Sequence, residues 1–304
     1  MAEALNQPIG LLAELTHRCL LGCPYCSNPL ALDKRDDELD AATWTQVFKE
    51  AAAMGIPHVH LSGGEPGARR DLVDIAANAR EAGLYTSLIT SGVGIATRTL
   101  RDLWEAGLDH VHVSIQDSDA VSADRIAGYR GAFQRKHALA AEAVRLGLPL
   151  TVNVVVHRAN IERIAGMVDL ALRLKAARIE IACAQYRGWA LKNRAALMPT
   201  AAQMSRVAAE VETLRHRHRG SIVVETVTPD ERFLHVSPSG RALPGHAAES
   251  IPDLTPWNVK EHSLADIWTK SPAFEALHAG RPCQAAQPAC DAASPAPAYE
   301  YRRM

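Results

Sequence analysis

The chain has 304 residues, a formal net charge of -1, 47% hydrophobic residues and 22% charged residues. This balance is typical of a globular protein and excludes wholesale disorder, because enough apolar material is present to build a core. A net charge so close to zero gives no strong field that would attract nucleic acid or an anionic membrane, so we expect neither as a partner.

Along the chain, short apolar runs alternate with longer segments that have helical spacing. Glycine follows most of the helical segments, where it is a common C-terminal stop. In chain order the predicted elements are strand Leu11–Thr16, helix Ala41–Met54, strand His58–Ser62, helix Leu72–Ala82, strand Tyr85–Thr90, helix Thr97–Ala106, strand His110–Gln116, helix Gly131–Leu146, strand Leu150–Val156, helix Ile161–Leu174, strand Arg178–Cys183 and helix Thr200–Arg217.

This order predicts an α/β fold in which helices cover a parallel sheet through right-handed crossovers. Six strand–helix units are too few for a complete eight-stranded barrel, so we expect a partial (β/α)6 barrel, with a doubly wound open sheet as the alternative. In either topology, reactive residues belong just beyond the C-terminal ends of the strands. A cysteine-rich segment follows the first strand, and Gly63–Pro66 follows the second.

The sequence changes character after Gly220. Ser221–Val227 fits one more strand, but prolines interrupt the segment that follows, and an Ala- and Pro-rich tail typical of loop or disorder begins at Pro282. Short helices fit two segments in between, Ser263–Trp268 and Pro272–His278. We therefore expect a barrel domain over residues 1–219 and a short C-terminal extension over residues 220–304.

The N-terminus lacks the basic start and apolar stretch of a secretory signal, and no window is apolar for long enough to cross a bilayer. We therefore expect a cytoplasmic protein, in which cysteines bind metals or act in catalysis more often than they form disulfides. The chain has six cysteines, and three of them, Cys19, Cys23 and Cys26, fall within a single short segment.

These three cysteines have the spacing C-x3-C-x2-C. Three thiolates in a tight loop can hold three irons of a [4Fe–4S] cluster and leave the fourth iron without a protein ligand. The amino nitrogen and carboxylate oxygen of S-adenosylmethionine (SAM) can chelate an open iron of this kind, which places SAM for reductive cleavage to a 5′-deoxyadenosyl radical. A tetrahedral zinc site with His17 as the fourth ligand is the alternative, although no second C-x2-C pair typical of zinc ribbons is present.

Gly63-Gly64-Glu65-Pro66 is the second element that indicates a SAM site. The glycines let the backbone approach a ligand closely, and Glu65 can accept a hydrogen bond from a cationic amino group. Together with the cysteine motif, this element resembles the radical SAM superfamily, in which a glycine–glycine–glutamate element binds the SAM amino group. The resemblance implies that Gly63, Gly64, Glu65 and Pro66 contact SAM and that Tyr25 packs near its adenine.

Polar residues at the ends of later strands are further candidates for contacts with SAM. Ser91 follows the third strand, Ser114 and Gln116 lie on the fourth, and Asn153 lies on the fifth. Each can hydrogen-bond the ribose, carboxylate or adenine of SAM, or can equally satisfy the backbone of a loop.

Two histidine pairs, His58/His60 and His110/His112, have the spacing of a strand, so the members of each pair share a face. We expect them to be polar residues at a sheet margin rather than metal ligands. Cys183, at the end of the sixth predicted strand, is expected to be a small buried residue.

Within the superfamily, the chain resembles the PqqA peptide cyclases of pyrroloquinoline quinone (PQQ) biosynthesis, from about Pro8 to Thr200. The segments that carry this resemblance are Leu11–Thr16, Cys19–Leu30, Ser62–Pro66, Leu88–Gly92 and Gln185–Arg194, and the last is not part of the general SAM machinery. The resemblance implies that hydrogen is abstracted from a glutamate of a precursor peptide, after which a carbon–carbon bond forms to a tyrosine ring. It also implies three partners: a PqqA-like peptide, a PqqD-like chaperone that presents it, and an electron donor such as flavodoxin.

The C-terminal part departs from the pattern of that family, which includes a cysteine-rich SPASM domain with two auxiliary iron–sulfur clusters. Gly245 stands where a Pro-Cys-His sequence is expected, and only Cys283 and Cys290 follow it. Two such clusters need about seven or eight ligands, which this chain does not contain. Two further hypotheses therefore stay open: another radical SAM peptide maturase, and an impaired homologue that binds the peptide without turnover.

Overall fold

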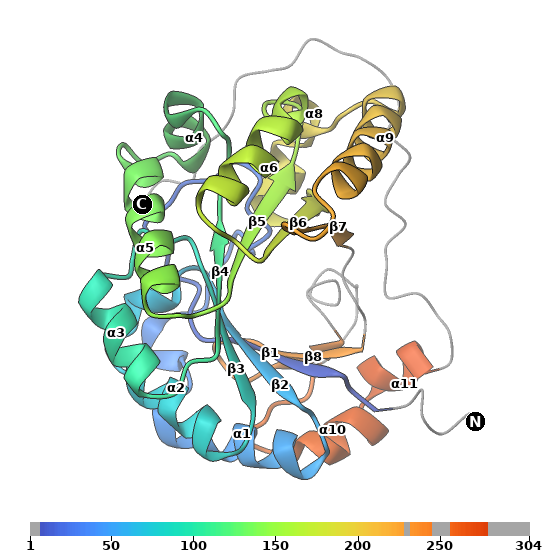
Figure 1. Cartoon of the computed structure of the whole chain (residues 1–304). Coiled ribbons are helices and arrows are strands. Elements are labelled where there is room, and N and C mark those ends of the chain that lie inside the picture. Colours follow the sequence, from blue (N-terminus) through green and yellow to red (C-terminus); the bar gives the residue numbers. More distant parts are fainter. Residues whose placement is uncertain (1–6, 228–231, 245–255, 279–304) are drawn as a thin grey trace.

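The computed structural model of the chain describes residues 7–227, 232–244 and 256–278. In this part of the chain, nine strands form one sheet in the order β7-β6-β5-β4-β3-β2-β1-β8-β9. Figure 1 shows the sheet curved into an open barrel, with the helices on its outer side and with β7 and β8 on either side of the opening.

The elements follow one another along the chain in an alternating order. They are β1 (Gly10–Glu14), α1 (Ala41–Ala53), β2 (His58–Ser62), α2 (Leu72–Glu81), β3 (Tyr85–Thr90), α3 (Thr97–Glu105), β4 (His110–Ser114), α4 (Ala120–Ala127), α5 (Ala132–Arg145), β5 (Leu150–Val156), α6 (Ile164–Arg173), β6 (Arg178–Cys183), α7 (Gly188–Lys192), α8 (Arg194–Leu197), α9 (Ala201–Arg217), β7 (Val223–Val227), β8 (Phe233–Val236), β9 (Ala242–Pro244), α10 (Leu264–Lys270) and α11 (Pro272–His278).

The predicted order of strands and helices is confirmed. Strands β2, β3, β5 and β6 have the predicted bounds, and the other predicted elements differ from the structure by up to three residues at an end. From β1 to β7 each strand pairs in parallel with the next one in the chain. From β1 to β7 the strand order follows the chain without a reversal, so the partial barrel is confirmed and the doubly wound sheet is wrong.

Five short elements were not predicted: α4, α7, α8, β8 and β9. The longest of them, α4, has eight residues, which is too short for a clear periodic pattern. Strand β8 pairs in parallel with β1, and β9 pairs antiparallel with β8. Together with β7, these strands extend both edges of the barrel sheet, so the predicted division after residue 219 separates parts of the chain that share one sheet. Gly245 and the tail from Pro282 lie outside the described residues.

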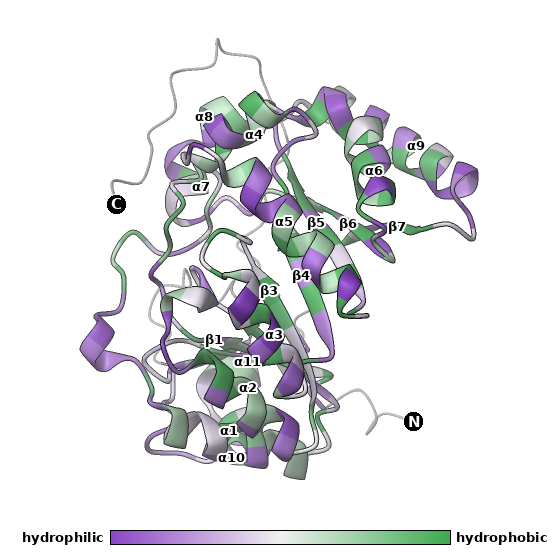
Figure 2. Cartoon of the chain, turned by 60° about the vertical axis from the view of Figure 1, so that its left-hand side comes forward, coloured by the Kyte–Doolittle hydropathy of each residue, from purple (hydrophilic) through white to green (hydrophobic). Residues whose placement is uncertain are grey.

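The hydrophobic core lies between the outer face of the sheet and the surrounding helices. Helix α1 shows how the sequence builds it: Asp40 caps the helix by accepting from the Thr43 N–H, and the buried residues Trp44, Val47, Phe48 and Ala51 recur at helical spacing on one face. In Figure 2 the helices carry both hydrophobic and hydrophilic residues, whereas β5 is mainly hydrophobic. None of the helices in the described part of the chain is both long and apolar enough to span a membrane.

The end of β6 corrects one expectation. Cys183, which we expected to be buried, is exposed. The expectation is wrong because Cys183 is the last residue of its strand, where the alternating burial of β6 ends.

The two histidine pairs lie on the inner face of the barrel, opposite to Val59, Leu61, Val111 and Val113, which are fully buried. The rings of His60 and His112 have centroids 5.5 Å apart. Neither histidine pair belongs, within the described residues, to a group of three or more His, Cys, Asp or Glu side chains that could hold a metal ion.

Burial lowers the pKa of His60 to about 3 and that of His110 to about 4. An unfolded histidine has a pKa of about 6.5. Between these values the unfolded chain binds more protons than the native chain, so the free energy of unfolding decreases as the pH falls below about 6.5.

We expect His60→Gln to weaken this acid sensitivity, because the variant removes one titrating group from the barrel interior. The slope of unfolding free energy against pH should decrease by up to about 1.4 kcal/mol per pH unit between pH 6 and 4. Denaturant unfolding at a series of pH values measures this slope. His216→Gln, at an exposed position of α9, is the control, and an unchanged slope in His60→Gln would contradict the interpretation.

Candidate active site

The cysteine loop, residues 15–28, begins at the C-terminal end of β1, as predicted. Cys19, Cys23 and Cys26 are each half-buried, and none of them is in a disulfide bond. Burial raises the pKa of the Cys23 thiol to about 12, and the charges of Cys26 and Cys19 act in the same direction. The three sulfurs therefore lie close enough to repel one another as thiolates, a repulsion that a shared cationic ligand would relieve.

Segments from later in the chain hold the loop from outside. The Gly22 N–H donates to the Ala127 carbonyl at 2.9 Å, and the Ala190 N–H donates to the Cys26 carbonyl at 3.0 Å. A Cβ atom on Gly188 would lie 1.8 Å from the Asn28 carbonyl oxygen, so only glycine permits this contact. The segment Gln185–Arg194, which carries the family resemblance, thus packs directly against the cysteine loop.

Gly63 and Gly64 bring the end of β2 against the start of the cysteine loop. The Gly64 N–H donates to the Thr16 carbonyl at 2.6 Å, and the Glu65 N–H donates to the Arg18 carbonyl at 2.7 Å. A Cβ atom would lie 2.4 Å from the Thr16 oxygen if placed on Gly63, and 2.5 Å from the oxygens of residues 17 and 18 if placed on Gly64. The close approach that the glycines permit is therefore to the backbone of the loop itself.

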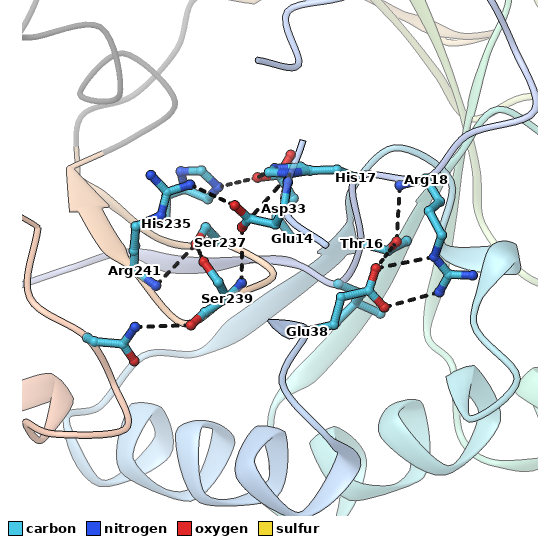
Figure 3. Close-up of polar contacts among 12 residues, drawn as sticks. Glu14, Thr16, His17, Arg18, Asp33, Glu38, His235, Ser237, Ser239 and Arg241 are labelled. Carbon is cyan, nitrogen blue, oxygen red and sulfur yellow. Dashed lines mark hydrogen bonds and ion pairs between the residues drawn. The ribbon is translucent and has the colours of Figure 1, made fainter. Parts of the chain in front are cut away.

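Polar side chains fix the base of the loop on one side, as Figure 3 shows. Glu38 accepts hydrogen bonds from the Thr16 hydroxyl at 2.5 Å and from two nitrogens of Arg18 at 3.1 and 3.3 Å. Thr16 and Arg18 flank His17, and Cys19 follows directly. The Glu38 carboxylate therefore fixes the start of the cysteine loop.

His17 and its neighbours fix the other side of the base. The Asp33 N–H donates to Nδ1 of His17 at 3.0 Å, and Nε2 of His17 lies 3.4 Å from the buried carboxylate of Glu14. Glu14 also lies 3.0 Å from Nε2 of His235 on β8, and Arg241 forms an ion pair with Asp33 at 3.3 Å. Both nitrogens of His17 are directed at these partners, so His17 is not placed as the fourth ligand that the zinc alternative requires.

The carboxylate of Glu65 is fully buried and accepts hydrogen bonds from the end of β3, from the residue after it and from its own turn. The donors are the Thr90 hydroxyl at 2.7 Å, the Ser91 N–H at 2.8 Å, the Ser91 hydroxyl, and the Gly67 N–H at 3.1 Å. The structure thus brings together Glu65 and Ser91, two predicted SAM contacts, but it places them against each other. Pro66 is buried at the first position of the short 3-10 helix Pro66–Ala68.

Tyr25 and Gln116, also predicted to contact SAM, meet on the other side of the cysteine loop. The amide nitrogen of Gln116 donates to the Tyr25 hydroxyl at 2.8 Å, and the Tyr25 ring packs on His157 with centroids 5.1 Å apart. The amide oxygen of Gln116 and Nε2 of His157 are buried without a hydrogen-bond partner in the described structure. Buried polar atoms are rarely left unpaired, so this pair of atoms fits the donors of a bound ligand.

Ser114 and Asn153 are direct neighbours in the pairing of β4 with β5. The Asn153 side chain hydrogen-bonds Glu180, which helps to lower the pKa of that carboxyl against the effect of burial. The Ser114 carbonyl accepts from Nζ of Lys136 at 2.7 Å. Ser114 thus lies at the C-terminal end of β4 beside Asn153, whereas Tyr25 and Gln116 contact each other and His157.

Lys136 is a site residue that the sequence analysis missed. Its side chain is 1% exposed, and burial lowers its pKa to about 8 against the raising effect of Cys23, Glu65 and Cys19. A cation therefore lies among the cysteine sulfurs and the glycine–glycine–glutamate element. One feature of the sequence could have identified Lys136. Its helical spacing places it on the buried face of α5, together with Ala132, Leu139, Ala140 and Ala143.

The residues present fit a [4Fe–4S] cluster with SAM. Three cysteines of one loop, of which Cys23 is electrostatically coupled to both others, supply the thiolates that such a cluster requires. A buried cation, two unpaired polar atoms and a glycine-lined backbone edge lie around them. These features match a ligand that carries a carboxylate, an amino group and a nucleoside.

Comparisons with known proteins agree with this site. The sequence matches the radical SAM superfamily over residues 13–171. It is 57% identical over 284 residues to the PqqA peptide cyclase of Methylocella silvestris, an alignment that covers 89% of this chain and 76% of the relative. It is 49% identical over 283 residues to the PqqA peptide cyclase of Rhizobium meliloti, with 88% and 76% covered. The chain thus spans about three quarters of the length of these relatives.

Solved structures share the fold at low sequence identity. Streptococcus suis SuiB bound to S-adenosylmethionine has a TM-score of 0.78 and is 20% identical, with 90% of this chain and 68% of SuiB covered. The protein anSMEcpe with bound AdoMet has a TM-score of 0.70 and is 13% identical, with 88% and 82% covered. From the superfamily match and the identity to the cyclases, the chain belongs to the radical SAM superfamily and, within it, to the family of PqqA peptide cyclases.

Proposed function

We propose that this chain binds a [4Fe–4S] cluster through Cys19, Cys23 and Cys26 and acts on a PqqA-like precursor peptide, joining a glutamate to a tyrosine in PQQ biosynthesis. The observation that carries the proposal is the cysteine loop, which is locked against the Gly63-Gly64 backbone in a chain 57% identical to a PqqA peptide cyclase. When bound, the cluster supplies the electron that cleaves SAM and so yields a 5′-deoxyadenosyl radical.

The chain's own residues bind and orient SAM. The main chain of Gly63 and Gly64 offers carbonyl groups to the amino group, because the Glu65 carboxylate is already occupied by Thr90, Ser91 and Gly67. Lys136 offers a positive charge to the SAM carboxylate, and it also offsets the charge of the thiolates.

Other residues form the wall for the nucleoside of SAM. Gln116 and His157 each offer a buried atom without a partner to the adenine or ribose, and Tyr25 holds both residues in place. Ser114 and Asn153, at the mouth of the barrel, are placed to bind the ribose or the peptide. Ser91 acts indirectly, because its hydroxyl positions Glu65.

The partners follow from the same proposal. SuiB, which shares the fold, has been solved bound to its precursor peptide SuiA, and this supports a peptide as the class of substrate. We include a PqqD-like chaperone, an electron donor such as flavodoxin, and a cytoplasmic location in the proposal. The alternatives are another radical SAM peptide maturase and a catalytically impaired homologue that binds the peptide without turnover.

The direct test is anaerobic reconstitution with iron and sulfide, followed by incubation with SAM, a reductant, a PqqA-like peptide and its chaperone. We expect 5′-deoxyadenosine and a peptide that is lighter by two hydrogens, both measured by mass spectrometry. Cys23→Ala, which removes one cluster ligand, should abolish both products. A protein that holds four irons per chain but forms no 5′-deoxyadenosine would contradict the proposal. 5′-Deoxyadenosine with an unchanged peptide would favour the first alternative, a maturase of another peptide.

Gly64→Ala tests whether the glycine element supports the cysteine loop. The added Cβ atom would meet two backbone oxygens at 2.5 Å, and such overpacking costs roughly 1–3 kcal/mol. We expect a displaced loop and a lower iron content after reconstitution, measured by metal analysis. Gly147→Ala, where a Cβ atom meets nothing within 4 Å at a φ of +78°, is the control for backbone strain alone. Equal iron contents in both variants would be evidence against the support role.

Glu65→Gln separates a structural role of Glu65 from direct binding of SAM. The amide would place donors opposite the donors of Thr90, Ser91 and Gly67, at a cost of roughly 2–4 kcal/mol. Denaturant unfolding of the cluster-loaded protein without SAM should therefore show a clear loss of stability. The control is Glu105→Gln, at an exposed position of α3. If the stability without SAM is unchanged and only SAM affinity falls, the structural role is wrong.

A further inference from the structure

One buried side chain joins the segments that follow β4 and β5, which are neighbours in the sheet (Figure 1). The main-chain pairing of these strands extends to the hydrogen bond from the Ile115 N–H to the Asn153 carbonyl at 2.9 Å. Gln116 and His157 both lie beyond that bond. There the side chain of Asn160, which is fully buried, connects the two segments.

The Asn160 amide uses all of its polar atoms in this position. Nδ2 donates to the Gln116 carbonyl and to the Val155 carbonyl, both at 2.9 Å. Oδ1 accepts from the His157 N–H, also at 2.9 Å. Both donor hydrogens of the amide and its oxygen are therefore engaged by main chain. The side chain takes over where the strand pairing ends, and it fixes the distance between the main chains of Gln116 and His157.

A buried ion pair forms a second link between the same segments. Asp117 directly follows Gln116, is fully buried, and accepts hydrogen bonds from Nε of Arg163 at 2.7 Å and from its Nη2. Arg163 also donates to the Ala159 carbonyl at 2.5 Å. The segment after β5 is thus tied to the end of β4 by Asn160 and by Arg163.

The contacts of the His157 ring determine which of its nitrogens carries the hydrogen. Nδ1 accepts from the Ala159 N–H at 3.3 Å. Burial lowers the pKa of His157 to about 4, so the ring is neutral at pH 7 and its hydrogen is on Nε2. Nε2 is buried without a hydrogen-bond partner in the described structure. His157 therefore offers one unused donor.

The Gln116 amide offers the opposite kind of atom. Its Nε2 donates to the Tyr25 hydroxyl at 2.8 Å, and this hydroxyl also hydrogen-bonds the Cys23 sulfur. The hydroxyl has a single hydrogen, which it gives to the sulfur, so it accepts from Gln116 and fixes the orientation of the amide. Oε1 of Gln116 is then the unused acceptor, buried without a partner among the described residues.

Adenine presents the complementary pair, because its N6 amino group donates and a ring nitrogen beside it accepts. Two hydrogen bonds to one rigid base require two protein atoms at a fixed spacing, since a good hydrogen bond spans only about 2.7–3.2 Å. We propose that Asn160 is the positioning residue that sets this spacing, so that His157 and Gln116 bind the adenine of SAM together. This inference rests on the proposed function, in which SAM binds at this site.

The test measures binding of two ligands to the cluster-loaded protein by anaerobic calorimetry: SAM, and S-inosylmethionine, in which an oxygen replaces the N6 amino group. The original protein should bind SAM at least about tenfold more tightly than the analogue. In Asn160→Asp, an oxygen replaces the donor that faces two carbonyls. SAM affinity should then fall about tenfold, and the preference for SAM over the analogue should shrink to within about threefold.

A double-mutant cycle separates positioning from a general loss of stability. Asn160→Asp should cost clearly less SAM affinity in a Gln116→Ala background, because a side chain that Asn160 positions is then already missing. The KM for SAM should rise, while the rate of 5′-deoxyadenosine formation at saturating SAM stays within about threefold of the original. Equal costs in both backgrounds, or an unchanged preference for SAM in Asn160→Asp, would overturn the inference.

Asn258→Asp is the matched control. Asn258 also donates to a main-chain carbonyl, that of Ser239, and accepts from a main-chain N–H, that of Lys260. This variant should bind SAM as the original protein does, and an equal loss in it would count against a specific role of Asn160.

A second variant covers the case in which Asn160→Asp does not fold. Asp117→Asn keeps the size of the side chain but weakens the ion pair with Arg163, so it should show a smaller loss of the same kind. Normal SAM affinity and preference in every folded variant of the two would overturn the positioning role alone. An original protein that holds the cluster but does not bind SAM would instead overturn the proposed function.

Discussion

The main chain of Gly63-Gly64 lies directly against that of Thr16–Arg18, and the rest of the site depends on this contact. Two backbone hydrogen bonds of 2.6 and 2.7 Å cross it, and neither glycine has room for a Cβ atom. The contact joins the C-terminal ends of β1 and β2, so the cysteine loop starts from a fixed base. The Glu38 side chain then binds Thr16 and Arg18, and the Asp33 N–H donates to the ring of His17.

Beyond this base, the ammonium of Lys136 and the carboxylate of Glu65 are both buried and attract each other. The Glu65 carboxylate accepts hydrogen bonds from Thr90 and Ser91, which ties the third strand to the first two. Lys136 brings one positive charge next to the sulfurs, although burial makes that charge costly. Such a cost is common at functional sites, where charged groups are held in place for a ligand.

The sequence predicted the barrel well because its strands and helices are long and periodic. It placed the cysteine loop and Gln116 at one edge of the sheet because the C-terminal ends of parallel strands lie together. Tyr25 came from the resemblance to the superfamily, and the contacts of both residues with SAM stay predictions. It did not show that Glu65 and Ser91 bind each other, since a motif does not tell whether a carboxylate faces a ligand or a neighbouring loop. Lys136 and His157 were missed because their contacts join residues far apart in the chain. The short elements α4 and β8 were missed because they have too few residues for a periodic pattern.

The account depends on three sulfurs that leave one iron open to SAM, and the electron paramagnetic resonance spectrum of the reduced protein tests this most directly. The spectrum should be recorded on anaerobically reconstituted protein, with and without SAM. We predict the signal of one reduced [4Fe–4S] cluster whose g-values shift when SAM is added. A cluster signal that does not respond to SAM, or a reconstituted protein that holds no iron, would contradict the account.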